Sequence, residues 1–447
     1  MDALPQHAEG ALLTGLTGSV VQMVGLTASV ADFPAPVGAL VDIHRDTGGV
    51  VEGEVVGFRE NQTLVMPLQN AGGVRRGSPV KLVRTSRTLK VGDELLGRVV
   101  DGRGRCIDGR PQPMLRTRRT LTPEAVPATE RPPIDAALPT GVKAIDAMLT
   151  CGRGQRIGVF AGSGVGKSVL MGMMSRRTAA DVSVIALIGE RSREVNEFIQ
   201  RELGPEGLAK SVVVVATSDQ PALIRTQAAL TATTIAEHFR DQGQDVLLVM
   251  DSLTRYALAQ REIGLSAGEP PTTRGYTPSV FAELPKLVER AGRTDRGSIT
   301  AFYSVLVEGD DENEPIADAV RGLLDGHVWL SRKIAERAQY PAIDVLPSIS
   351  RLMNTVADDR HRASAELLRR LMATLRDHED LVSIGAYRKG SNPELDVALE
   401  ARPQIDQLLA QRPEESHDFA AVLGDVQKLA QACAAKLGAT QNPKAEG

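Results

Sequence analysis

At 447 residues, the chain is too long for one ordinary hydrophobic core, and its length predicts two or three domains. The apolar fraction of 42% and the charged fraction of 24% are those of a globular protein, and a net charge of −4 provides no overall positive field to attract nucleic acid. Aromatic residues make up only 3%, which argues against a protein that stacks single-stranded bases.

The cysteines and histidines form no recognisable metal or disulfide pattern. Cys106, Cys151 and Cys433 are scattered, and the 7 histidines show no ligand spacing. This usage predicts free thiols in a reducing compartment. No run approaches the ~18 apolar residues of a membrane span, and the start of the chain does not resemble a secretory signal. We therefore expect a cytoplasmic protein.

The N-terminal part divides into a leader and a β-rich region. Residues 1–17 are either a frayed tail or a short amphipathic docking segment. From residue 18 to 93, short alternating segments broken by glycine and proline predict a small antiparallel β-barrel. The Pro- and Arg-rich stretch 116–133 follows, and we interpret its basic cluster as solvated linker.

The central region, residues 94–364, alternates continuous apolar runs with helical stretches. Such runs predict a parallel sheet covered by helices on both faces, with ligands at the carboxyl ends of the strands. The predicted strands are residues 155–160, 182–189, 211–217, 245–250, 298–307 and 327–331. Residues 365–447 have helical periodicity, which makes Cys433 a core thiol. The expected fold is therefore α/β, with a barrel, a P-loop (RecA-like) sheet domain and a helical C-terminal domain.

A glycine-rich loop between a predicted strand and helix is the strongest chemical signal. Its glycines let backbone N–H groups turn toward a phosphate, Lys167 reaches the terminal phosphates, and Ser168 is placed to bind Mg²⁺. The first motif position is Ala161 rather than glycine, which an ordinary backbone conformation tolerates. The expected nucleotide-binding residues are Gly162, Ser163, Gly164, Val165, Gly166, Lys167, Ser168 and Val169.

Two further predicted strands end in carboxylates. Asp251 follows one strand, as in a Walker B motif, although it is also suited to cap the next helix. Glu190 ends another strand, where it could polarise water for attack on the γ-phosphate or cap the following helix. Arg191 and Arg193 either contact phosphate or face solvent. The acidic run from Glu308 to Glu314 is interpreted as a solvated loop rather than a metal site.

Together these segments resemble a known family. GQRIGVFAGSGVGKS, IGERSREVNEFI, DVLLVMDSLTRYA and PAIDVLPSIS are similar to the catalytic subunits of the rotary ATP synthase superfamily. Residues 252–292 and 299–332 resemble its protein-export branch, the ATPases of flagellar assembly and type III secretion. The resemblance implies that Lys167 and Ser168 bind phosphate and magnesium, that Glu190 is the catalytic glutamate with Arg191 as a phosphate neighbour, and that Asp251 is the Walker B aspartate.

The same resemblance implies two roles near the signature PAIDVLPSIS. Tyr340 would stack on adenine, although alone it would be taken for a core tyrosine. Arg351 would be an arginine finger supplied to the active site of the neighbouring subunit. A finger used in this way requires an active site at a subunit boundary, and the superfamily's geometry implies a homo-hexameric ring.

The expected function is hydrolysis of Mg·ATP to energise protein export, with a flagellar role favoured over a virulence-type one. The implied partners are a peripheral-stalk regulator, a central stalk protein, substrate–chaperone complexes and a membrane export gate, with no nucleic acid and a position at the inner membrane. One alternative is a catalytic subunit of an ion-translocating ATP synthase, although residues 380–396 lack the acidic lever loop of such subunits. Another is an RNA-translocating ring helicase, which the low aromatic content disfavours.

Overall fold

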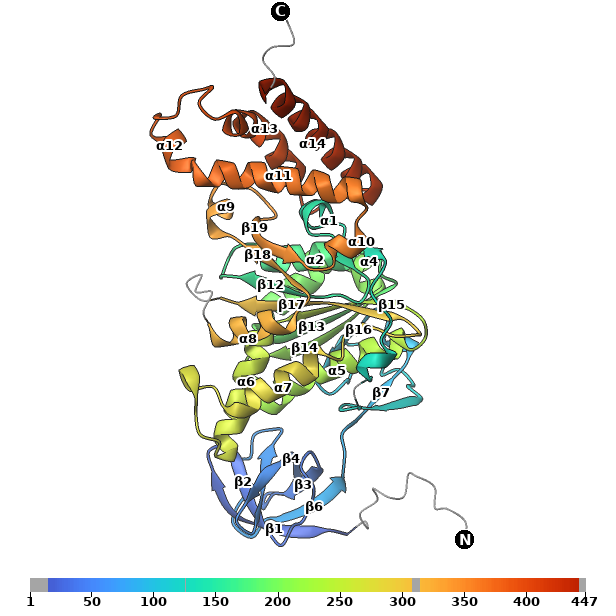
Figure 1. The fold of residues 1–447 in the computed structure, drawn as a ribbon. Coiled ribbons are helices and arrows are strands. Elements are labelled where there is room, and N and C mark those ends of the chain that lie inside the picture. Colours follow the sequence, from blue (N-terminus) through green and yellow to red (C-terminus); the bar gives the residue numbers. More distant parts are fainter. Residues whose placement is uncertain (1–14, 125, 308–313, 442–447) are drawn as a thin grey trace, which may run out of the picture.

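Six antiparallel strands close into a barrel at the N-terminal end of the chain (Figure 1). The computed structural model describes residues 15–124, 126–307 and 314–441. In the order in which they pair, the barrel strands are β1 (Thr17–Val24), β2 (Thr27–Ala31), β5 (Gln62–Pro67), β4 (Val50–Arg59), β3 (Leu40–His44) and β6 (Pro79–Arg84). Alternate side chains such as Val41 and Ile43 fill the barrel interior. The predicted barrel is confirmed.

The barrel ends at Arg84, earlier than the expected limit at residue 93. β7 (Thr88–Val91) instead pairs with β9 (Thr117–Thr120) in a separate two-stranded ribbon. The reason lies in packing, because Leu89 and Val91 are buried against the central domain and not in the barrel.

The central sheet contains all six predicted strands and lies across the middle of the molecule (Figure 1). Its order is β19 (Ile343–Ser350), β18 (Gly326–Leu330), β12 (Arg156–Ala161), β17 (Ser298–Leu306), β15 (Asp245–Asp251), β13 (Val182–Glu190), β14 (Ser211–Thr217) and β8 (Arg98–Asp101). These neighbours are parallel except for β19, which runs antiparallel to β18. β16 (Gly292–Arg293) pairs antiparallel with β17, and β10 (Ala137–Leu138) pairs with β11 (Cys151–Gly152) in a separate sheet.

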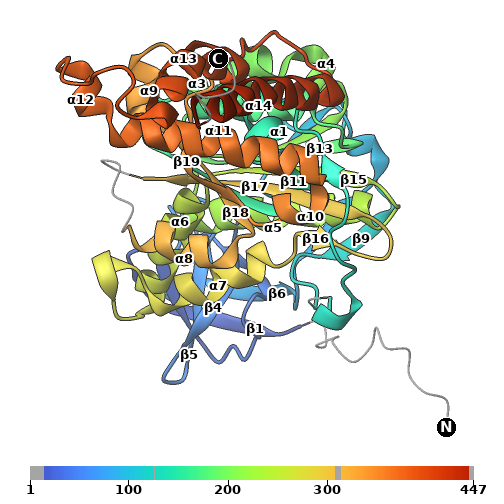
Figure 2. The same cartoon turned by 45° about the horizontal axis from the view of Figure 1, so that its top comes forward.

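Helices cover both faces of this sheet, as predicted. Along β13, Val184, Ala186 and Ile188 point into one hydrophobic core and Ile185 and Leu187 into the other, which explains the uninterrupted apolar run. The first core contains helices α5 (Ala222–Arg240), α6 (Leu253–Ala267), α7 (Pro278–Val288) and α8 (Pro315–Leu323). The second contains α1 (Lys143–Met148), α2 (Lys167–Arg177) and the C-terminal helices, and Figure 2 shows these two layers on opposite sides of the sheet.

The C-terminal domain is helical, as expected. Its helix α11 begins at Asp359, where the Asp358 side chain accepts a hydrogen bond from the His361 N–H at 2.7 Å and caps the helix. Cys433 is 3% exposed, which confirms its interpretation as a core thiol. The long helices here are α11 (Asp359–Asp377), α13 (Pro393–Leu409) and α14 (Phe419–Gln441).

The short helices of the chain include α3 (Ser192–Glu197), the π-helix Phe198–Leu203, α4 (Gly204–Ala209), α9 (Arg332–Glu336), α10 (Met353–Val356) and α12 (Glu379–Ser383).

Residues 1–14 of the leader and residues 308–313 of the acidic run lie outside the described residues. Glu314, the last member of that run, corrects the solvated-loop interpretation for its own position: it is buried and caps α8 by accepting the Ala317 N–H at 2.8 Å. Within the described ranges, no cluster of three or more metal-binding side chains is present. No helix in the same ranges is both long and apolar enough to cross a membrane.

Candidate active site

The glycine-rich loop joins β12 to α2 at the carboxyl edge of the sheet. Gly164 and Gly166 have φ angles of 81° and 93°, a left-handed conformation that a side chain would strain. Ala161 is still part of β12 and is buried, so the departure from glycine at that position costs nothing. Lys167 and Ser168 then form the first turn of α2, where free N–H groups and the helix dipole favour an anion.

Lys167 and Asp251 form the centre of the site. The Nζ of Lys167 lies 2.5 Å from Oδ1 of Asp251, at the end of β15. The Ser304 hydroxyl, on β17, donates to the same oxygen at 2.6 Å. Both partners are largely buried, with side chains 11% and 6% exposed. Asp251 is therefore turned into the site. Ser304 was missed in the sequence because it lies inside a continuous apolar strand.

Glu190 ends β13, beside β15. Burial raises the pKa of Glu190 to about 7, with help from the negative charge of Asp251 and a hydrogen bond with Glu194, while Lys167 and Arg255 act in the opposite direction. The residue at the N-cap position of α3 is Arg191, so the alternative that Glu190 caps this helix is not supported. A carboxyl group with a pKa near neutrality suits proton transfer.

Arg255 holds Glu190 in place and was not predicted. Its Nε lies 3.1 Å from Oε1 of Glu190, and its Nη1 donates to the Gly189 carbonyl at 2.6 Å. Arg255 is on α6, four residues after Asp251, so the helix that follows β15 supplies it. By contrast, the Arg191 side chain is 78% exposed and contacts Glu194 at 3.4 Å, and Arg193 is also exposed.

Tyr340 lies beside the glycine-rich loop. A Cβ built on Gly166 would lie 3.7 Å from the Tyr340 ring, which is itself 46% exposed. Arg351 is not brought to this site. It follows β19, whose last residue Ser350 pairs with Gly326 at the amino end of β18, and its N–H donates to the Asp325 carbonyl at 3.0 Å.

The hard oxygen donors near the loop suit Mg²⁺. Asp251 offers a carboxylate and Ser168 a hydroxyl, and Mg²⁺ typically takes one or two such protein ligands together with substrate phosphates and water. A parallel sheet with this loop and with acids at neighbouring strand ends defines a P-loop nucleoside triphosphatase.

Comparison with known proteins narrows this class. Residues 141–350 match the ATP synthase alpha/beta family, nucleotide-binding domain, and residues 357–428 match the T3SS EscN ATPase C-terminal domain. The flagellum-specific ATP synthase of Bacillus subtilis (strain 168) is 52% identical over 405 residues, covering 89% of this chain and 91% of that protein. The type 3 secretion system ATPase of Xanthomonas euvesicatoria is 49% identical over 395 residues, covering 88% and 89%.

A solved structure agrees along nearly the whole chain. The assembled ATPase EscN from the enteropathogenic E. coli type III secretion system has a TM-score of 0.88 and 44% identity, and the match covers 92% of this chain and 100% of that one. The chain belongs to the ATP synthase alpha/beta family, in its branch of flagellar and type III secretion ATPases. It is an ATPase of protein export, as the sequence resemblance implies, and the ATP synthase and helicase alternatives are not favoured.

Proposed function

We propose that this chain hydrolyses Mg·ATP at the subunit boundaries of a homo-hexameric ring and thereby powers export of flagellar proteins. The observation that carries this proposal is the convergence of Lys167, Asp251 and Glu190 at one edge of the sheet. The flagellar role is supported by relatives of that name, including one from Salmonella typhimurium that is 50% identical over 432 residues.

The proposed chemistry divides the work among these side chains. Lys167 and the loop N–H groups hold the terminal phosphates, with Ser168 and Asp251 at the magnesium ion. Magnesium, when bound, offsets charge on the phosphates. Glu190, positioned by Arg255, accepts a proton from the attacking water. Tyr340 stacks on the adenine. Arg191 is proposed as a phosphate neighbour on the resemblance alone, because its side chain is exposed.

The position of Arg351 supports the proposed ring. Ile343, near Tyr340, pairs with Leu330, whereas Ser350, next to Arg351, pairs with Gly326; four residues of β18, or about 13 Å, separate these two levels of the sheet, and we therefore assign Arg351 to the active site of a neighbouring chain. A neighbouring chain can accept it, and a finger of this kind accelerates phosphoryl transfer by about 10³–10⁵. The solved relative EscN is described as assembled, which supports an oligomer here.

The proposed partners follow the relatives. EscN has also been solved with its central stalk EscO, and we assign this chain an equivalent central stalk protein. A peripheral-stalk regulator, substrate–chaperone complexes and a membrane export gate complete the proposed set, with the ring on the cytoplasmic side of the inner membrane.

Phosphate release by the purified protein in Mg·ATP tests the catalytic roles. Glu190→Gln and Lys167→Ala should each lower turnover by about a hundredfold or more. Glu197→Gln is the matched control, because it removes a carboxylate of the following helix α3, which pairs with Arg201 at the surface. Turnover retained by Glu190→Gln would contradict the proposed base, and turnover retained by Lys167→Ala would contradict the phosphate-binding loop.

A further inference from the structure

A strongly basic cleft lies between the barrel and the central domain, away from the nucleotide site. Its volume is about 440 Å³. We call it the basic cleft, and its cationic lining residues are Arg84, Arg87, Lys90, Arg103, Arg105 and Arg118. Glu52 is the one carboxylate that lines it. Although the net charge of the chain is −4, positive charge is therefore concentrated in the basic cleft.

Two of these cationic side chains form ion pairs with carboxylates of the barrel. Both terminal nitrogens of the Arg103 guanidinium donate to the Glu52 carboxylate, with the Nη2–Oε1 contact at 2.8 Å. Arg87 lies 3.2 Å from the buried carboxylate of Glu54. Both carboxylates belong to β4 of the barrel, so these pairs fix the cleft walls relative to each other.

The remaining cations are left without such partners. Lys90 on β7 and Arg118 on β9 are directly opposite each other in the ribbon, and both are exposed. Like charges in this arrangement repel. In the ranges that the structure describes, neither residue nor Arg84 has a carboxylate within ion-pair distance, and Arg105 reaches only Glu52, at 3.9 Å. An anion from outside the described chain would relieve this repulsion.

The ribbon also offers an open edge. β9 pairs with β7 and with no other strand of the described residues. The Leu121 N–H donates to the Arg87 carbonyl at 3.1 Å, and because ladder bonds alternate in an antiparallel pair, the N–H and C=O of Arg118 face away from β7. An extended peptide could therefore add to β9 as a further strand.

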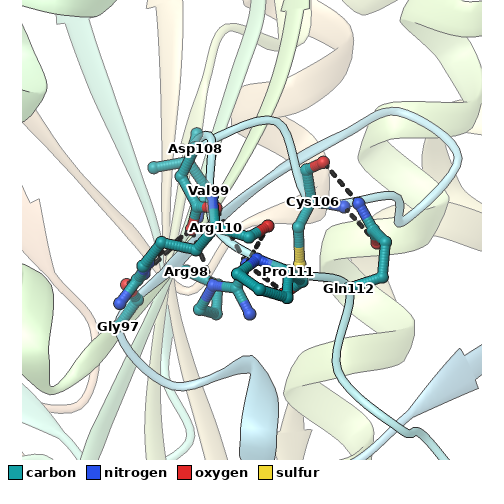
Figure 3. A network of polar contacts seen from close by, with 8 residues as sticks. All are labelled: Gly97, Arg98, Val99, Cys106, Asp108, Arg110, Pro111 and Gln112. Carbon is teal, nitrogen blue, oxygen red and sulfur yellow. Dashed lines mark hydrogen bonds and ion pairs between the residues drawn. The ribbon is translucent and has the colours of Figure 1, made fainter.

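The loop that supplies Gln112 to the cleft is held by a network of polar contacts (Figure 3). Asp108 accepts hydrogen bonds from Arg98 at 2.7 Å and from Arg110 at 2.8 Å, and the bond from Arg98 holds the pKa of the Asp108 carboxyl well below its usual range. Gln112, which lines the cleft, binds both the N–H and the C=O of Cys106, at 3.0 and 2.7 Å. The cleft is thus largely formed in the absence of a partner.

We infer that the basic cleft binds an extended acidic segment of a partner protein, which adds to the β9 edge and places its carboxylates on Lys90, Arg118 and Arg84. The apolar lining side chains Leu40 and Leu115 suit alternate apolar residues of such a strand. The lining includes no aromatic ring on which a nucleic-acid base could stack. A flat bilayer does not fit a concavity between two domains. This inference is independent of the proposed catalytic roles.

Fluorescence anisotropy with a short labelled peptide that alternates glutamate and valine tests this site on the full-length protein. The double variant Lys90→Glu with Arg118→Glu should weaken binding by about tenfold or more, because attraction becomes repulsion. The matched control, Arg388→Glu with Lys389→Glu, makes the same change of charge on the exposed C-terminal domain and should leave binding unchanged. ATPase activity and the melting temperature should be unchanged in both variants.

A second probe separates strand addition from simple charge attraction. The same peptide with methylated backbone nitrogens keeps its charge but cannot donate hydrogen bonds to β9, and it should bind distinctly more weakly. Equal binding of the two peptides, or equal loss in both protein variants, would overturn the inference. Binding of phosphatidylglycerol vesicles that depends on these charges, without binding of the peptide, would also overturn it. The same holds if the only effect of the Lys90→Glu, Arg118→Glu double variant is a change in self-association.

Discussion

Tyr340 and Arg351 lie at opposite ends of one strand, β19. Tyr340 precedes the strand and lies beside the glycine-rich loop, whereas Arg351 follows it at the amino end of the sheet, where its N–H binds the Asp325 carbonyl. A single segment therefore places one residue beside the glycine-rich loop of its own chain and the other away from it. The proposed active site is complete only when two chains meet.

Complementation between two inactive variants tests this arrangement. When Lys167→Ala and Arg351→Ala chains are co-expressed, about a quarter of the boundaries in a randomly mixed ring combine an intact lysine with an intact arginine. Phosphate release should therefore reappear in the mixture. Each variant alone, and a chain carrying both changes, should stay inactive. A mixture as inactive as its components would show that Arg351 does not act across the boundary.

The pH dependence of kcat/KM for ATP should report Glu190 in the free enzyme. Because burial raises the pKa of Glu190 to about 7, the carboxyl is protonated below this pH and cannot accept a proton. Activity should rise as the pH increases through about 7. A profile already flat from pH 5 upward (about two units below, where an ordinary glutamate is ionised) would contradict the assignment.

Arg255 provides a second check on the same group. Its positive charge lowers the pKa of Glu190, so Arg255→Ala should move the rising limb of the kcat/KM profile to higher pH as well as reducing the maximum. The control is Arg193→Ala, which removes an exposed arginine of the neighbouring helix α3. If Arg255→Ala lowered activity equally at every pH, Arg255 would not act through Glu190.

Tyr340→Ala should raise the KM for ATP by about tenfold with a small effect on kcat, because stacking on a base contributes to binding rather than to the chemical step. Tyr340→Phe keeps the ring and should restore the KM. A large fall in kcat with unchanged KM would assign Tyr340 to another role.

The features that depend on short segments were predictable from the sequence. A continuous apolar run followed by a polar residue marks the end of a buried parallel strand, and this pattern by itself predicts that Glu190 and Asp251 lie at one edge of the sheet. The glycine-rich loop carries its own signature in residues 162–168.

Features created by tertiary contact escaped prediction. β8 is a four-residue strand that joins the sheet beside β14, more than a hundred residues later in the chain. β19 is an edge strand that contains Pro347 and alternates between buried and exposed side chains, so it lacks the apolar run of its neighbours. Arg255 resembles any polar residue of an amphipathic helix until the fold places it against Glu190.

Binding of Mg·ATP, measured by isothermal titration calorimetry on the full-length chain, tests the central claim most directly. The Glu190→Gln variant is the suitable sample, because it should retain the phosphate-binding loop while turnover no longer contributes heat. The account predicts saturable binding that disappears when Lys167→Ala is added to the same chain. Absence of Mg·ATP binding by both the unmodified and the Glu190→Gln chain would contradict it.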